Sequence, residues 1–161
     1  MKTRILVFVT IIVLAVLVSS FLLAQSDPFI GTWKQNIAKS KYSPGPAPKS
    51  QTQTYEAQGN GIKLSTDGTA ADGSRMTWSY STNFDGKDSP ISGTGAPNGA
   101  DTIALKRVNP NTYEATFKKA GKVVGTGRDV VSKDGKIRTI TAKGTDANGN
   151  AVSRIIVWDK Q

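Results

Sequence analysis

Carboxylates and amines are the only groups in this sequence that could act as an acid or a base near neutral pH. The chain has no histidine and no cysteine, so imidazole and thiolate chemistry is excluded. Four of the aspartates, Asp67, Asp72, Asp85 and Asp134, directly precede glycine. Aspartate in that position hydrogen-bonds the local backbone of a turn. Because the ordered spacing of a calcium loop is also missing, we expect no catalytic residues, no metal site and no cofactor.

Aromatic side chains form the first constellation that could bind a molecule. Trp78 and Tyr80 alternate with polar residues, and Phe117 does the same on a later segment, which puts these rings on the inner face of a sheet. We predict that Tyr55, Trp78, Tyr80 and Phe117 contact an apolar ligand. The alternative is that the rings only fill the core of a small barrel.

Arginines form the second constellation. By the two-residue period of a strand, Arg107, Arg128 and Arg154 each share a face with aliphatic neighbours. An inward guanidinium requires a buried carboxylate or an anionic ligand, and most acidic residues here lie in turns. Arg107 and Arg128 are therefore predicted to bind the head of an anionic amphiphile. The alternative is that bulges reverse the parity, or that the guanidinium groups reach the barrel rim.

The elements that would position these side chains are strands. Alternation and turn signals predict strands over 29–35, 50–57, 61–67, 74–84, 101–108, 112–119, 122–131, 136–143 and 151–158. No segment after Asp27 has helical periodicity. This pattern predicts an all-β domain, an antiparallel up-and-down β-barrel of about eight to ten strands, with a sandwich as the alternative.

Turn residues divide the predicted strands. Seven Asn-Gly or Asp-Gly dipeptides, Asp67-Gly68 among them, predict hairpin turns, because glycine accepts a positive φ freely. Residues 38–50 contain Pro44-Gly45-Pro46-Ala47-Pro48 and are expected to form no strand. They are interpreted as a linker, with a lid over the barrel mouth as the alternative.

The first 26 residues have the layout of an export signal. A short cationic start is followed by an apolar run that ends at Leu23 and by the small-residue exit Ala24-Gln25-Ser26. We expect residues 1–26 to be a signal peptide and residues 27–161 to be one barrel domain, periplasmic or secreted. Cleavage after Ala24 and an uncleaved membrane anchor are the alternatives, and an anchor would be the domain's only membrane contact.

The charge of the expected domain favours acidic partners. Without Lys2 and Arg4 the chain keeps 19 basic and 12 acidic residues, a net charge of +7. Such a balance suits an anionic amphiphile or polysaccharide, while an exported chain with scattered basic residues is not expected to bind nucleic acid. The alternative is a merely soluble charged surface. The sequence does not predict the oligomeric state.

Three stretches of the sequence resemble known families. Asp27-Pro28-Phe29-Ile30-Gly31-Thr32-Trp33-Lys34 resembles the opening strand of lipocalins and fatty-acid-binding proteins, whose signature is Gly-x-Trp. Lys39 to Pro46 and Phe84 to Asp88 resemble a family of exported bacterial lipocalin-like proteins of unestablished activity. The resemblance implies a calycin-type barrel and an apolar small-molecule ligand. It also implies that Trp33 closes one barrel end beneath a basic side chain of the last strand, here Arg154.

Three functions are consistent with these features. The first is an exported binding protein for a small apolar or amphiphilic ligand, either anionic or neutral. The second is a non-enzymatic structural or interaction protein of the cell envelope with a filled barrel. The third, a barrel enzyme using carboxylate chemistry, is the least favoured because imidazole is absent.

The first expected outcome concerns export. A fusion of residues 1–26 to a reporter that is active only outside the cytoplasm should be active, and the processed protein should begin near Asp27. Intact-mass spectrometry of the soluble protein checks the cleavage site. Soluble protein that still carries Met1 would contradict the prediction.

Overall fold

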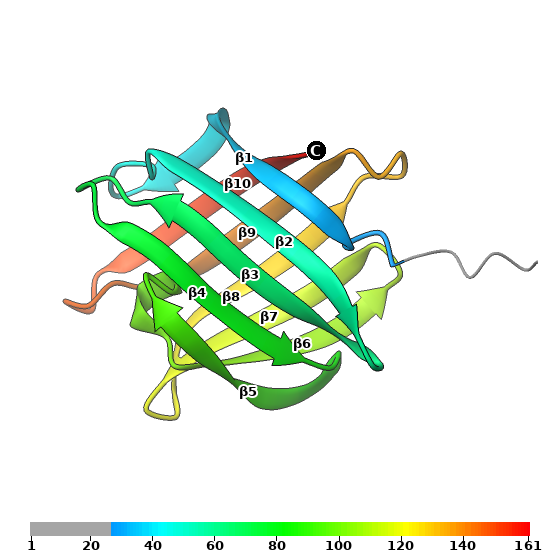
Figure 1. Ribbon diagram of the computed structural model, residues 1–161. Helices are drawn as coiled ribbons and strands as arrows, with labels where there is room; N and C mark the ends of the chain where they lie inside the picture. Colours follow the sequence, from blue (N-terminus) through cyan, green and yellow to red (C-terminus); the bar gives the residue numbers. More distant parts are fainter. Residues whose placement is uncertain (1–26) are drawn as a thin grey trace, which may run out of the picture.

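Ten antiparallel strands close into a barrel in the computed structural model, which describes residues 27–161 (Figure 1). The predicted signal segment lies outside the described residues. Each strand pairs with the next along the chain, and the first pairs with the last, which closes the sheet. The strands are β1 (Gly31–Ser43), β2 (Ser50–Gln58), β3 (Gly61–Thr69), β4 (Arg75–Thr82), β5 (Asp85–Thr94), β6 (Thr102–Asn109), β7 (Thr112–Lys119), β8 (Lys122–Val131), β9 (Ile137–Thr145) and β10 (Ala151–Lys160), with the short 3-10 helix η1 (Pro97–Gly99) between β5 and β6.

The predicted all-β antiparallel barrel is confirmed, but one strand was missed. β5 was not predicted because it lacks a buried apolar stripe: it is exposed at most positions and contains Gly86 and Pro90. Its backbone still pairs with β4 on one side and β6 on the other. The strand is therefore specified by the closure of the barrel rather than by its own side chains.

Three local expectations were wrong, and one of them is the predicted turn at Asp85-Gly86, which lies at the start of β5. Residues 38–43 belong to β1, which continues past a register shift between Asn36 and Lys41, so only the segment between Ser43 and Ser50 connects the strands. Asp67-Gly68 is not a turn, because both residues lie inside β3. A Cβ on Gly68 would lie 2.4 Å from the Ser50 carbonyl oxygen, so the close approach of β2 accounts for the glycine.

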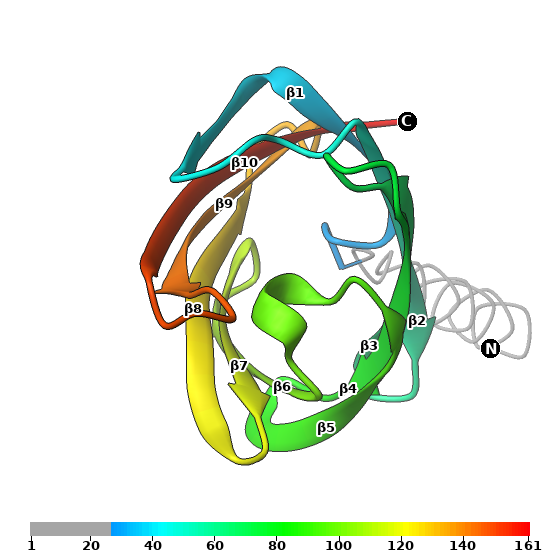
Figure 2. The same cartoon turned by 90° about the vertical axis from the view of Figure 1, so that its left-hand side faces the viewer.

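One end of the barrel is closed by the residues that precede β1, and we call it the Phe29 end. The chain before β1 turns into the barrel, where Phe29 is fully buried with its ring 4.6 Å from that of Tyr113 (Figure 2). The indole of Trp33 donates a hydrogen bond to the Phe29 carbonyl oxygen at 2.8 Å. Residues 27–30 and β1 therefore pack together as one unit.

The opposite end is occupied by η1, and we call it the η1 end. Figure 2 shows this short helix inside the opening of the barrel rather than outside its wall. The Asn98 side chain donates to the Val124 carbonyl oxygen at 2.8 Å and accepts from Arg154 at 2.9 Å. A Cβ on Gly144 would lie 2.5 Å from the Asn98 amide nitrogen, so β9 needs glycine where η1 docks.

Trp33 is fully buried, but Arg154 does not cover it. Lys160 lies opposite Trp33 in the β1–β10 register, and its ammonium is 5.0 Å from the indole ring. Arg138 of β9 lies at 5.4 Å from the same ring. Arg154 is six residues before Lys160, about 20 Å along the strand at the usual rise per residue. The basic side chain does come from the last strand, as expected, but it is Lys160.

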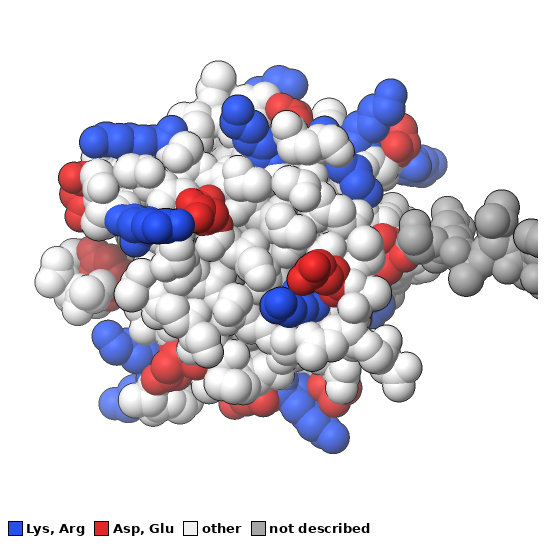
Figure 3. All heavy atoms as spheres, in the orientation of Figure 1, with Lys and Arg blue, Asp and Glu red and all other residues white. Residues whose placement is uncertain are grey.

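The face seen in Figure 3 has acidic and basic side chains interspersed, with uncharged side chains between them. Exposed cross-strand ion pairs such as Arg75–Asp67, at 2.9 Å, account for part of this pattern. Within residues 27–161, no helix is long and apolar enough to cross a membrane.

The second expected outcome concerns Trp33. Replacing it by alanine should lower the free energy of unfolding by about 3–5 kcal/mol, because a fully buried ring and its hydrogen bond are lost. Lys160→Met should cost no more than about 1 kcal/mol, since it removes one partly solvated cation–π contact. Urea denaturation measures both. A loss under about 1 kcal/mol for Trp33→Ala would mean that the residue is not part of the core.

Candidate ligand-binding cavity

A cavity of about 90 Å³ lies inside the barrel, between η1 and the packed core. All four aromatic residues predicted to contact a ligand, Tyr55, Trp78, Tyr80 and Phe117, line it. The first three are at least 95% buried. The rings of Trp78 and Tyr80 are stacked, with their centroids 6.1 Å apart. The structure therefore brings the predicted aromatic set together around one space.

The wall of the cavity opposite Tyr55, Trp78 and Tyr80 consists of β7, β8 and β9 and contains small residues next to Phe117. Ala115, Gly127 and Ala142 are aligned in register across β7, β8 and β9, and all three line the cavity. A Cβ on Gly127 would make only ordinary van der Waals contacts, the nearest at 3.6 Å. The backbone therefore has room for a side chain at Gly127, and a larger residue there would extend toward the cavity.

Arg107 does not line the cavity. It lies at the Phe29 end, where its guanidinium forms an ion pair with Asp27 and stacks 3.5 Å from the centroid of the Phe84 ring. The sequence indicated no acidic partner for this arginine, because Asp27 belongs to a segment that was expected to lie outside the strands. Arg107 is already paired with an acidic residue of the protein, and the structure does not bring it together with the predicted aromatic set.

Arg128 faces outward. Its side chain is half exposed and forms an ion pair with Glu114 on the neighbouring strand, at 3.2 Å. The inward residues of β8 are Gly125, Gly127, Asp129 and Val131. The parity of Arg128 was assigned wrongly because its aliphatic neighbour Val130, which is 37% exposed, was taken as an inward residue.

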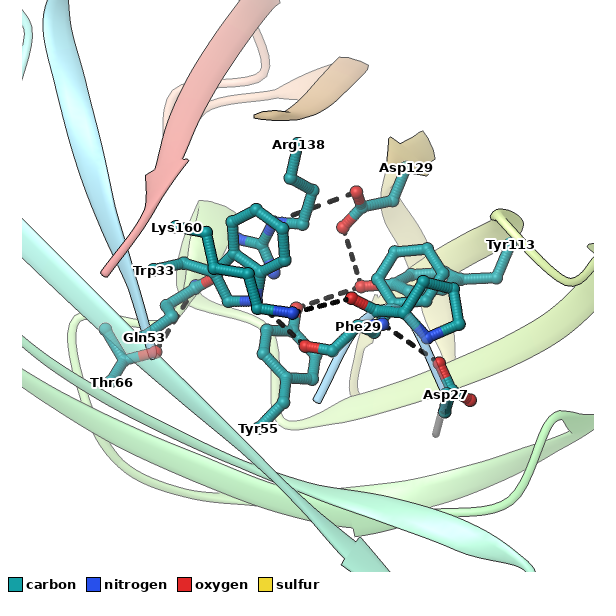
Figure 4. A network of polar contacts seen from close by, with 11 residues as sticks. Asp27, Phe29, Trp33, Gln53, Tyr55, Thr66, Tyr113, Asp129, Arg138 and Lys160 are labelled. Atoms are coloured by element: carbon teal, nitrogen blue, oxygen red, sulfur yellow. Dashed lines mark hydrogen bonds and ion pairs between the residues drawn. The ribbon is translucent and has the colours of Figure 1, made fainter. Parts of the chain in front are cut away.

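A buried ion pair lies between the cavity and the Phe29 end (Figure 4). Arg138 of β9 is fully buried, and Asp129 of β8 is 2% exposed, with the Arg138 Nε 3.8 Å from the Asp129 Oδ1. Arg138 also donates to Gln53, and its guanidinium lies 4.8 Å from the ring of Tyr55 and 4.7 Å from that of Trp158. The faces of these two aromatic rings and the Asp129 carboxylate thus replace water around the Arg138 guanidinium.

A chain of hydroxyl groups extends from the ion pair. Tyr113 donates to the Asp129 Oδ2 at 2.7 Å, and the Tyr55 hydroxyl lies 2.9 Å from that of Tyr113. Burial raises the pKa of Asp129, while the charge of Arg138 and the Tyr113 hydrogen bond act against that rise. Burial raises the pKa of Tyr113 well above its ordinary value, so the phenol remains a neutral donor.

Sequence reasoning missed both members of the ion pair, although the signal was present. Arg138 alternates with Ile140 and Ala142 on the inward face of β9, and Asp129 alternates with Val131 on β8. The same parity argument that was applied to the other arginines would have placed both inside. The register of β8 against β9 could not be predicted, so their proximity was not apparent.

Arg154 belongs to the mouth of the cavity. It faces inward, as its parity predicts, and it lines the cavity beside Asn98 and Lys143. Burial lowers the pKa of the Arg154 guanidinium. Over residues 27–161, no group of three or more His, Cys, Asp or Glu side chains is placed to hold a metal ion.

The third expected outcome concerns the ion pair. Asp129→Asn leaves the Arg138 charge buried without a carboxylate and should cost about 3–5 kcal/mol in the free energy of unfolding. Arg138→Met should cost a similar amount, and the double variant should cost clearly less than the two losses together, with a coupling of about 1–3 kcal/mol. The exposed pair Arg128–Glu114 is the control and should couple by less than about 1 kcal/mol. Additive losses at the buried pair would contradict the expectation.

The comparisons with known proteins identify the fold. No family model matches the sequence, and no curated protein matches it. Among solved structures, the zebrafish ileal bile acid-binding protein is similar with a TM-score of 0.52 at 11% identity, over 83% of this chain and 99% of that one. Lobster apocrustacyanin A1 has a TM-score of 0.45 at 12% identity, over 88% of this chain and 66% of that one. The chain thus shares the barrel fold of a bile acid-binding protein, as its resemblance to the calycin-type proteins implied.

Proposed function

We propose that the barrel binds a small, predominantly apolar molecule in its interior. The observation that carries the proposal is the cavity itself, which is bordered by Trp78 and Tyr80 of β4 on one side and by Phe117 and small residues on the other. Apolar, largely preformed pockets with a few polar groups are the usual form of a small-molecule site. The zebrafish protein with this fold was crystallised with cholic acid, which supports a binding role for the interior of such a barrel.

The size of the cavity limits the ligand. About 90 Å³ is less than the roughly 150 Å³ of an engineered apolar cavity that binds benzene. A compact ligand smaller than benzene therefore fits the barrel as it stands, whereas a five-membered ring, which is about as bulky as benzene, fits only if η1 moves outward. A longer molecule would have to displace η1 from the mouth, where Asn98 and Arg154 hold it.

The small volume of the cavity favours a second candidate function. A cavity this small leaves most of the barrel filled by side chains, as expected for a structural or interaction protein of the envelope. We propose a non-catalytic role in either case, because the buried polar groups are engaged chiefly with one another rather than with the cavity. We also propose that the domain acts outside the cytoplasm, on the basis of the export-signal layout of residues 1–26.

The fourth expected outcome tests binding with cyclopentane as the probe. Burying its five methylenes at about 0.8 kcal/mol each gives about 4 kcal/mol, or a Kd of about 1 mM. Methyl NMR signals of Leu64 and Ile103, which line the cavity, should shift saturably during a titration.

Two variants on β8 make the test specific. Gly127→Val fills the space in front of the small-residue wall and should abolish the saturable shifts. Arg128→Met is its matched control, because the side chain next along the strand faces outward, and binding should be unchanged. Absence of saturable shifts in the unmodified protein would favour the filled-barrel function instead.

A further inference from the structure

Two indole N–H groups beside the cavity have no acceptor. Trp78 of β4 and Trp158 of β10 both line the cavity and are 4% and 1% exposed. No atom of residues 27–161 accepts a hydrogen bond from either indole nitrogen. The third tryptophan differs, because the Trp33 indole donates to the Phe29 carbonyl oxygen. Since an indole N–H can only donate, whatever satisfies Trp78 or Trp158 must offer an acceptor.

The charges of the interior leave no place for a charged ligand group. Arg138 carries one positive charge and Asp129 one negative charge, and the two lie side by side beneath the cavity. An additional ionised group enclosed with them would be unbalanced, which is strongly unfavourable in a buried site. The remaining cations of the lining, Arg154 and Lys143, belong to the mouth, and the side chain of Lys143 is exposed to solvent.

Among the residues that line the cavity, the buried polar atoms without a partner are the two indole nitrogens, which are donors, and the Asp129 Oδ1, which is an acceptor. That oxygen faces the Arg138 Nε at 3.8 Å and is electrostatically compensated there. The enclosed part of the cavity thus presents an apolar surface with surplus donors, and the positive charge of Arg154 lies at its mouth.

We infer that the ligand is uncharged where the cavity encloses it, and that it offers a carbonyl or ether oxygen to the indole N–H of Trp78 or Trp158. This inference rests on the proposed function and specifies its ligand class as a compact neutral molecule with an acceptor oxygen. It differs from the anionic amphiphile that the arginine pattern suggested, because Arg107 and Arg128 do not line the cavity.

Three probes of similar size test the inference: cyclopentanone, cyclopentane and cyclopropanecarboxylate, a carboxylate with the same number of non-hydrogen atoms as the ketone. In a ¹H–¹⁵N spectrum the three tryptophans give three indole signals. Cyclopentanone should move the signal of Trp78 or Trp158 downfield, as a new hydrogen bond does, and should leave that of Trp33 in place because its donor is occupied. The carboxylate should bind at least about tenfold more weakly than the ketone, because its charge would be enclosed without a partner.

Variants that remove one donor isolate its contribution. Trp78→Phe and Trp158→Phe keep an aromatic ring and delete the N–H. The variant at the indole whose signal moves should lose about threefold to tenfold in affinity for cyclopentanone, the usual range for one neutral hydrogen bond. Because phenylalanine is smaller than tryptophan and alters the volume of the cavity for both probes, the loss is measured as the ratio of the ketone affinity to the cyclopentane affinity, and the other variant should retain the ratio of the unmodified protein.

The possible failures are distinguishable. If cyclopentane binds as tightly as cyclopentanone and no indole signal moves, the acceptor inference is overturned while the proposed binding function stands. Tighter binding of the carboxylate than of the ketone would overturn the neutral-ligand inference in the same way. If none of the three probes shifts the methyl signals of the cavity, the proposed function itself fails.

Discussion

The charge of Arg138 is the constraint on which the interior of this barrel depends. A guanidinium cannot lose its proton at any ordinary pH, so its full burial requires a set of partners to replace water. Those partners come from separate strands: Asp129 from β8, Gln53 and Tyr55 from β2, and Trp158 from β10. These partners meet only if the sheet closes so that β1 lies between β2 and β10. They also require the observed register of β9 against β8. A slip of one residue would turn Arg138 outward and leave Asp129 unpaired.

The ion pair of Arg138 and Asp129 also divides the interior of the barrel into two parts with different properties. Toward the Phe29 end, the N-terminal segment, Trp33 and the phenol of Tyr113 pack without a gap, and Arg107 with Asp27 stabilises the same end at its rim. Toward the η1 end, the Asn98 side chain is hydrogen-bonded to Val124 and Arg154, and Ala96 and Ala100 on either side of η1 are packed against the core or buried. Such hydrogen bonds contribute about 0.5–1.5 kcal/mol each, less than burial of the aromatic core.

The alternation of apolar and polar residues along each segment was enough to predict part of the structure. The inward rings of β4 and β7 and the closed barrel follow from period two and from turn spacing, without knowledge of which strands are neighbours. β5 could not be found, because its own residues carry no apolar stripe and its place is fixed by β4 and β6. The partners of the arginines could not be predicted from the local sequence either. Arg107 pairs with Asp27, eighty residues away, and the cation above Trp33 follows from the β1–β10 register, which no local pattern specifies.

Three inward glycines show how backbone positions set what the barrel can hold. A Cβ on Gly125 would lie 2.9 Å from the Asn98 amide nitrogen, and one on Gly144 would lie 2.3 Å from the Val124 carbonyl oxygen and 2.5 Å from that amide nitrogen. Gly127 differs, because a Cβ there would make only ordinary van der Waals contacts, the nearest at 3.6 Å. Gly125 and Gly144 therefore allow the close approach of η1 and β8, whereas Gly127 has room for a side chain beside the cavity. Because Ala115 and Ala142 flank Gly127 in register, each added methyl group in this row would reduce a cavity of only about 90 Å³. In the proposed function, this wall would limit the size of a ligand, whereas the indole donors would select its polarity.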